Sequence, residues 1–315
     1  MTIARGENSW FRYIVEATWG TPPTTGTMQP VAIVSEALKF VKTKNPSNSI
    51  NDHGNIVTLI NSPNSVSGNS VHELRYGEFD TIFESAMGAA WATDVLTNGQ
   101  TESSLSFERG LFDIEVFHLF QGVRASGFSL SVPSDARKVD LTFNYIGKDE
   151  LIPVPSGTDG DWVGDNVGVT LGTNPAAAKS PMYLECGELK IDDTTVSVIT
   201  GLNLDVNRQL APVNTVDCDD PIELSRTGLI TVTGNLNGVI EDNDMYNRYI
   251  NDTVFTLDLQ FTDGTSTYLF VMDHVELTDS EQPIAGPGDV VNNSPFQAFY
   301  DSTLTGSLQI TRSAT

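Results

Sequence analysis

Basic residues are scarce in this 315-residue chain, and long apolar runs are missing. Seventeen Lys and Arg stand against 41 Asp and Glu, which gives a net charge of −24. Proteins that grip DNA, RNA or anionic lipid over a broad face need a positive surface, so the composition argues against that class. No stretch of about 18 apolar residues is present to span a bilayer. The opening residues carry charges at Arg5, Glu7 and Arg12 and lack the apolar core of a signal peptide.

Cysteine is nearly absent as well. Cys186 and Cys218 are too few for a disulfide framework, and their spacing matches no metal motif. We expect both to be reduced thiols in a protein made in the cytoplasm. The acidity is uneven, because residues 1–150 hold 11 basic and 17 acidic side chains and residues 151–315 hold 6 and 24. An apolar fraction of 39% is still enough for a globular core.

Alternation with period two fills many short segments. In residues 137–145 and 256–261 the apolar side chains share one face and the polar ones the other, and residues 104–108, 201–207 and 307–311 alternate in the same way. This pattern predicts half-buried antiparallel strands. Asp263-Gly264 between two such runs predicts a hairpin turn. Helical spacing is confined to two short groups, Phe79, Ile82, Phe83 and Met87 in the first and Met245 and Tyr249 in the second.

The chain also carries a weak internal repeat. The Pro-, Gly- and Asp-rich stretch 148–166 has no period and predicts a linker. At an offset of 166 residues, Leu38 falls on Leu204, and residues 66–69 (Val-Ser-Gly-Asn) fall on residues 232–235 (Val-Thr-Gly-Asn). We therefore predict an all-β fold with short helices, built from tandem duplicated β-sandwich or β-barrel modules. The first module with an N-terminal arm spans residues 1–150, and the linker and second module span residues 151–315.

Two apolar segments are candidates for subunit contacts. Residues 43–65 form a connection far longer than the usual 4–6 residues or so. Their apolar residues either tuck onto their own module or dock on another subunit, and we predict a contact between subunits of successive rings by Ile56, Val57, Leu59 and Ile60. Near the N-terminus, aromatic residues alternate in an arm that ends at a Gly-Thr-Pro-Pro turn. They either form a carbohydrate platform or anchor the arm on their own domain or a neighbour, and we predict docking on another subunit by Trp10, Phe11 and Tyr13.

Motifs of catalysis and cofactor binding are missing. No HExxH, GxSxG, P-loop or GxGxxG pattern occurs, and the histidines at 53, 72, 118 and 274 form no metal-ligand spacing. A pair of catalytic carboxylates cannot be singled out among 41 acids. The acidic run 159–165 has a partial likeness to a calcium loop without the rest of the EF-hand pattern. We predict no catalytic residue, no cofactor and no metal site.

Several segments together resemble a known family. The opening residues 4–30, with Arg5-Gly6, Phe11, Glu16 and Gly20-Thr21-Pro22, look like the start of the roughly 300-residue tail tube (major tail) proteins of long-tailed bacteriophages. The likeness is dense over residues 4–150 and looser over residues 195–312. The other segments that carry it are 35–43, 73–87, 104–132, 143–150, 234–236 and 296–301. Residues 51–53 are less basic than the family pattern, and residues 151–180 have no counterpart in it.

The resemblance implies a structural virion protein, made and assembled in the cytoplasm of the bacterial host. Its subunits are expected to stack as rings into a hollow tail tube that conducts DNA during ejection, with other tail proteins at the tube ends and no membrane partner. An acidic lumen would repel phosphates, so genomic DNA would pass without specific binding. Two modules in each chain favour a trimeric ring with pseudo-sixfold symmetry, and a true hexamer is the alternative. The other functions are a β-sandwich adhesin or carbohydrate-binding module, and a carboxylate-dependent glycosidase.

Overall fold

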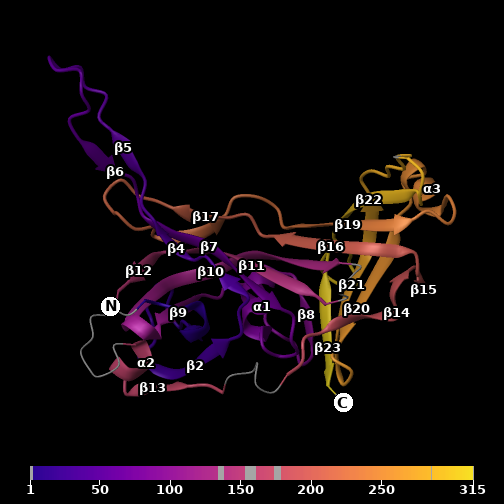
Figure 1. Cartoon of the computed structure of the whole chain (residues 1–315), viewed down its shortest axis with the longest axis horizontal. Coiled ribbons are helices and arrows are strands. Elements are labelled where there is room, and N and C mark those ends of the chain that lie inside the picture. The colour runs from indigo at the N-terminus through magenta and orange to yellow at the C-terminus, as the bar shows by residue number, and fades with distance from the viewer. Residues whose placement is uncertain (1–2, 134–137, 153–160, 174–178, 285, 315) are drawn as a thin grey trace.

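The computed structural model (Figure 1) describes residues 3–133, 138–152, 161–173, 179–284 and 286–314, and for residues 185–187 the backbone alone. Strands dominate, and the helices in this part of the chain are short, which confirms the predicted all-β fold with short helices. The helical elements are α1 (Asp80–Met87), α2 (Trp162–Asp165), α3 (Asp244–Ile250) and the 3-10 turns η1 (Gly6–Asn8) and η2 (Phe112–Ile114).

The strands divide between the first half of the chain, residues 1–150, and the second half, residues 151–315. Those that begin in the first half are β1 (Ser9–Val15), β2 (Thr25–Val31), β3 (Ser35–Glu36), β4 (Lys39–Val41), β5 (Lys44–Pro46), β6 (Leu59–Asn61), β7 (Ser65–Glu73), β8 (Val95–Thr97), β9 (Leu105–Leu111), β10 (Val116–Pro133), β11 (Asp140–Gly147) and β12 (Asp149–Leu151). Those of the second half are β13 (Gly168–Leu171), β14 (Tyr183–Ile191), β15 (Thr194–Thr195), β16 (Ile199–Asn207), β17 (Leu210–Val213), β18 (Glu223–Arg226), β19 (Thr231–Val239), β20 (Phe255–Thr262), β21 (Ser266–Leu277), β22 (Val291–Ala298) and β23 (Gln309–Ala314).

Local sequence pattern explains many of these elements. In β11 the apolar residues Leu141, Phe143 and Tyr145 are buried, and the polar residues between them are more exposed. The predicted turn at 263–264 joins β20 to β21, with the Asp263 amide donating to the Ser266 carbonyl. Helix α1 buries residues at helical spacing because one face packs on the sheet.

One antiparallel sheet runs through both halves. Its strands follow in the order β4, β7, β11, β10, β16, β19 and β22. Strand β10 links the halves: one edge of its C-terminal part pairs with β11, and the other edge pairs with β16, from Gly127 opposite Asn207 to Pro133 opposite Gly201. Main-chain hydrogen bonds therefore continue from one half to the other.

The two faces of this sheet differ sharply. Its buried face contributes to one core that contains aromatic residues of both halves, and the ring centroids of Phe83 and Phe270 lie 6.4 Å apart. The opposite face is polar. One row of directly paired residues crosses five neighbouring strands, β11, β10, β16, β19 and β22. In that order its members are Thr142, Ser129, Asp205, Thr233 and Gln297.

The same order of elements occurs twice in the chain. Strands β7 and β19 each have nine residues, begin 166 residues apart and share the same alternation of burial. A hairpin precedes each of them, β5–β6 and β17–β18, with Pro46 opposite Leu59 in one and Pro212 opposite Leu224 in the other. A short helix, a hairpin (β9–β10 or β20–β21) and a final strand (β11 or β22) follow in both halves.

The predicted linker is more ordered than its composition indicates. Residues 149–151 pair with β10, and Asp161 forms an ion pair with the buried side chain of Arg12. Strand β13 lies parallel to β2, and Val169 packs beside Ile14. Residues 153–160 of the linker lie outside the described residues. Residues 149–151 and 161–171 thus pack on the first half, and β23 also pairs with its strand β8.

Candidate assembly interface

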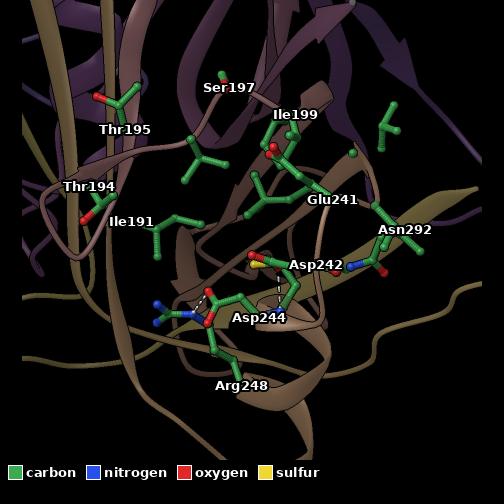
Figure 2. A pocket seen from close by; sticks show the side chains of 18 of the residues that line it. Ile191, Thr194, Thr195, Ser197, Ile199, Glu241, Asp242, Asp244, Arg248 and Asn292 are labelled. Carbon is green, nitrogen blue, oxygen red and sulfur yellow. Dashed lines mark hydrogen bonds and ion pairs between the residues drawn. The ribbon is translucent and has the colours of Figure 1, made fainter.

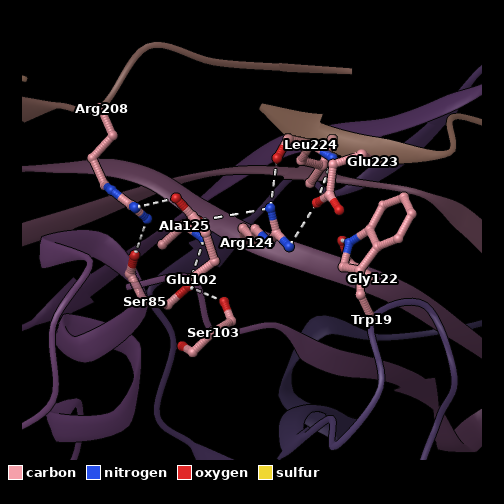
Figure 3. A network of polar contacts seen from close by, with 10 residues as sticks. All are labelled: Trp19, Ser85, Glu102, Ser103, Gly122, Arg124, Ala125, Arg208, Glu223 and Leu224. Atoms are coloured by element: carbon pink, nitrogen blue, oxygen red, sulfur yellow. Dashed lines mark hydrogen bonds and ion pairs between the residues drawn. The ribbon is translucent and has the colours of Figure 1, made fainter. Parts of the chain in front are cut away.

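The junction between the halves is held by Arg208, the residue directly after β16 (Figure 3). Its side chain is fully buried. The guanidinium donates from Nη1 to the Ser85 carbonyl oxygen and from Nη2 to the Glu102 carboxylate, each at 2.7 Å. Ser85 lies in the last turn of α1, where carbonyl groups lack helical partners and favour a cation. Burial lowers the pKa of Arg208, and Glu102 opposes that shift. The second half is therefore anchored at the C-terminal end of α1.

Gly88 makes room for this anchor. Its φ of +64° lies in the left-handed region that favours glycine at a helix C-terminus. A Cβ at this position would stand 2.6 Å from Nη2 of Arg208. Glycine is required here because the backbone is left-handed and because there is no room for a side chain.

Hairpin β17–β18 lies against the first half. Arg124 of β10 donates from Nη1 to the Leu224 carbonyl oxygen at 2.6 Å, and its Nη2 lies 2.8 Å from the Glu223 carboxylate (Figure 3). The Leu224 side chain is only 2% exposed. Near the hairpin tip, the Asn64 amide donates to the Asp219 carbonyl oxygen at 2.6 Å. The hairpin of the second half thus contacts the first half through β18 and again near its tip.

Hairpin β5–β6 has no such support. Figure 1 shows it projecting from the body of the molecule, and its residues Ile56, Val57, Leu59 and Ile60 are between 54% and 65% exposed. The alternative that these residues tuck onto their own module is wrong. Their role as a subunit contact stays a prediction for Ile56, Val57, Leu59 and Ile60.

The N-terminal aromatic residues belong to the core of their own chain. Phe11 and Tyr13 are 1% and 4% exposed, and β1 has a strand partner on both edges, β2 and β9. This burial corrects their assignment to a docking arm, because alternation in an internal strand turns these side chains inward. Trp10 is partly exposed and stacks on Phe117 at 5.5 Å, so its role as a contact stays a prediction.

A cavity of about 290 Å³ lies in the second half between β19, α3 and the segment before β16 (Figure 2). Four of its lining residues are acidic, and Arg248 pairs with two of them, Asp192 and Asp244. Burial alone would raise the pKa of Asp192, but hydrogen bonds from the Thr256 amide and Arg248 lower it. A glycosidase acid needs a raised pKa, so Asp192 is unsuited to that role.

The buried carboxylate of Glu108 has a structural role. It pairs with Arg12 and accepts a hydrogen bond from the Trp162 amide, which ties this part of the predicted linker to β1 and β9. Asp161, in the partial calcium motif, pairs with the same Arg12 and caps α2, while Asp159 lies outside the described residues. The described residues contain no group of three or more His, Cys, Asp or Glu that could hold a metal ion.

Two further sequence predictions can be compared with the structure. Cys218 is a free, exposed thiol, and the side chain of Cys186 lies outside the described part. No helix among the described residues is long and apolar enough to cross a membrane.

Sequence reasoning missed Arg208, Glu102 and Arg124. The only available signal was the 166-residue offset, which aligns Arg208 with another basic residue, Lys42.

Comparison with protein families gives a match over residues 6–298 to a family described as phage tail tube protein. Comparison with curated proteins gives no match.

Proposed function

The chain belongs to the phage tail tube protein family, and we propose that its subunits form stacked rings whose hollow centre conducts DNA during ejection. It is a structural tail component of the virion, made and assembled in the host cytoplasm, with other tail proteins at the tube ends. It uses no catalytic residue or cofactor. The family match over nearly the whole chain is the observation that carries this proposal.

Each ring contains three chains, and each chain is a tandem pair of tail-tube modules, residues 1–150 and 151–315. The support is the repeated order of elements, with β7 and β19 of equal length 166 residues apart. Three chains then supply six modules, and intrachain and interchain contacts alternate around the ring. Barrel closure links strand number to diameter, so the number of modules is fixed.

Unpaired strand edges support closure between chains. In the first half, residues 127–133 of β10 pair with β16. In the second half, the segment that corresponds to residues 127–133 is 278–284. One of its edges is hydrogen-bonded to β22 through the amides of Thr278 and Glu281, and its other edge has no strand partner among the described residues. Within the same described ranges, β4 pairs with β7 alone. A head-to-tail contact between these two edges generates a closed ring.

The polar face of the shared sheet lines the lumen. Its outward positions are mainly Ser, Thr and Asn. The charged ones include Glu73, Asp140 and Asp205 against Lys39 and Lys138, and Lys138 pairs with both Glu73 and Asp140. A surface with more acidic than basic groups repels DNA phosphates and offers few donors that would hold them. We expect Asp205→Lys combined with Ser129→Lys to leave ring formation intact and to make the tubes retain DNA. Asp205→Asn is the control, and equal DNA retention by both variants would contradict this orientation.

Electron microscopy of concentrated protein tests the ring directly. Tubes or rings with three chains are expected by symmetry averaging and by the mass of an isolated ring built from 34.1-kDa chains. Six chains in each ring would refute the trimer and favour the hexamer. Dispersed monomers that bind sugar would instead support the adhesin alternative.

A further inference from the structure

We infer that hairpin β5–β6 docks on the second half of an adjacent copy in the same ring, with Lys42 paired to Asp252 and Val57 packed on Tyr300 of that copy. This inference rests on the proposed ring of three chains. It differs from the ring-to-ring contact predicted from sequence for residues 43–65. The intrachain docking of hairpin β17–β18 serves as its template.

The first step concerns the anchor that precedes each hairpin. Arg208 follows β16 and pairs with Glu102, which lies three residues before Leu105, the first residue of β9. At the 166-residue offset Arg208 corresponds to Lys42, the residue after β4. In the second half, Asp252 lies three residues before Phe255, the first residue of β20. Each half thus has a basic residue directly after the strand that precedes its hairpin, and an acidic residue three positions before β9 or β20.

In the described part of one chain, these two side chains have no partner. Lys42 and Asp252 are both exposed, and neither side chain has an ion pair or hydrogen bond among the described residues. Their intrachain counterparts lie 2.7 Å apart, with the arginine fully buried. An adjacent copy that repeats the intrachain geometry would bring Lys42 against Asp252 and give each charge a partner.

The second step concerns the hairpin itself. Pro46 and Leu59 face each other in β5–β6 as Pro212 and Leu224 do in β17–β18. Leu224 is 2% exposed because the first half covers it, and Leu59 is 54% exposed. The difference in burial marks the surface that the second copy would cover.

The third step concerns the surfaces that receive the hairpin tips. In the first half, Lys148 is the residue after β11, and it lines a hollow together with residues 218–222 of the other hairpin, which include Asp219 and Asp220. In the second half, Phe299 and Tyr300 follow β22 and are 39% and 65% exposed. After the final strand, the first half thus presents a lysine beside this hollow, and the second half presents exposed aromatic rings.

The tip of β5–β6 has matching chemistry. By the strand pairing, Val57 corresponds to Ile222, and the side chains of Ile56 and Val57 are 65% and 59% exposed. His274 stacks on Phe299 at 5.3 Å with the rings nearly parallel, which holds the aromatic surface in place. An aliphatic tip and an aromatic surface, both exposed in the single chain, complement each other between copies.

A charge exchange tests the anchor. Lys42→Glu and Asp252→Lys should each leave the folded chain unchanged, as measured by circular dichroism, and each should abolish ring formation in electron micrographs. The double variant should restore rings. Glu7→Lys reverses a charge at another exposed position and should assemble normally. Single variants that form normal rings, or a double variant that stays dispersed, would overturn the inference.

A second pair of variants tests the tip contact. Val57→Asp and Tyr300→Asp should each give folded chains that form no rings. Val216→Asp is the control and should assemble, because Val216 of hairpin β17–β18 is even more exposed than Val57. Variants that still form single rings but no longer stack into tubes would put the hairpin between rings and overturn the inference. If Lys42→Glu forms normal rings of three chains, this inference is wrong but the proposed function still holds. If the unmodified chain forms no rings, the proposed function itself is wrong.

Discussion

Replacing Arg208 with methionine should weaken the junction between the two halves of the chain. Methionine keeps an unbranched apolar stem and removes the guanidinium, so the Ser85 carbonyl and the Glu102 carboxylate each lose a donor at 2.7 Å. The side chain of Glu102 is 29% exposed and can regain water, whereas Ser85 is fully buried and cannot. The loss of stability therefore comes mainly from the unpaired Ser85 carbonyl at the C-terminal end of α1.

The size of the effect follows from these contacts. A hydrogen bond to a charged group contributes about 1.5–3 kcal/mol net, so two such bonds set an upper range of roughly 3–6 kcal/mol. Nε of Arg208 is buried without a partner, and methionine removes that cost together with the desolvation of the cation. We expect the free energy of unfolding to fall by about 3 kcal/mol.

Urea denaturation of the dispersed chain at pH 7 measures this change. Lys42→Met is the matched control, because Lys42 holds the corresponding position and is exposed. Its free energy of unfolding should stay within about 0.5 kcal/mol of the unmodified chain. If Arg208→Met loses less than about 1 kcal/mol, the cost of burying the guanidinium cancels its hydrogen bonds and this account of the junction is wrong.

Three further predictions follow from the same structure. Gly88→Ala should cost at least about 1 kcal/mol in urea denaturation, because φ is +64° and the new Cβ would meet Arg208; equal stability would contradict the steric argument. Leu224→Ala should cost about 2–3 kcal/mol and Leu59→Ala less than about 0.5 in the dispersed chain, since only Leu224 is buried, and equal losses would refute the difference in docking. Burial lowers the pKa of His72 to about 4, below its ordinary 6.5. The unfolded chain therefore binds a proton that the folded chain does not, and the free energy of unfolding should fall by about 3 kcal/mol as the pH drops from 6.5 to 4. Urea midpoints of the unmodified chain should fall with pH more steeply than those of His72→Gln, and parallel curves would rule this out.

The candidate interface was only partly predictable. The exposed hairpin residues could be singled out because four aliphatic side chains within residues 56–60 of a long polar loop are unusual. Phe11 and Tyr13 misled the same reasoning, since aromatic alternation looks alike in an internal strand and in an arm that docks on a neighbour. Arg208 gave no signal of its own, because a lone arginine after a strand is as often solvated as buried.

Local pattern in the sequence predicted many of the strands and two short helices, but it missed β12 and α2 within the predicted linker. Alternation in residues 137–145 and helical spacing from Phe79 to Met87 are properties of neighbouring residues, so they needed no knowledge of distant parts of the chain. The 166-residue offset was readable for the same reason: it compares local patterns, and β7 and β19 lie at that separation.

Only the tertiary structure decided how these elements pair. That β10 joins β16, that β13 lies parallel to β2 and that one hairpin is docked while its counterpart is exposed depend on residues far apart in the chain. Strand edges are chemically alike, because every residue except proline presents the same amide and carbonyl groups. Periodicity therefore specifies which face of a strand is buried, and the choice of partner comes from the packing of the whole chain.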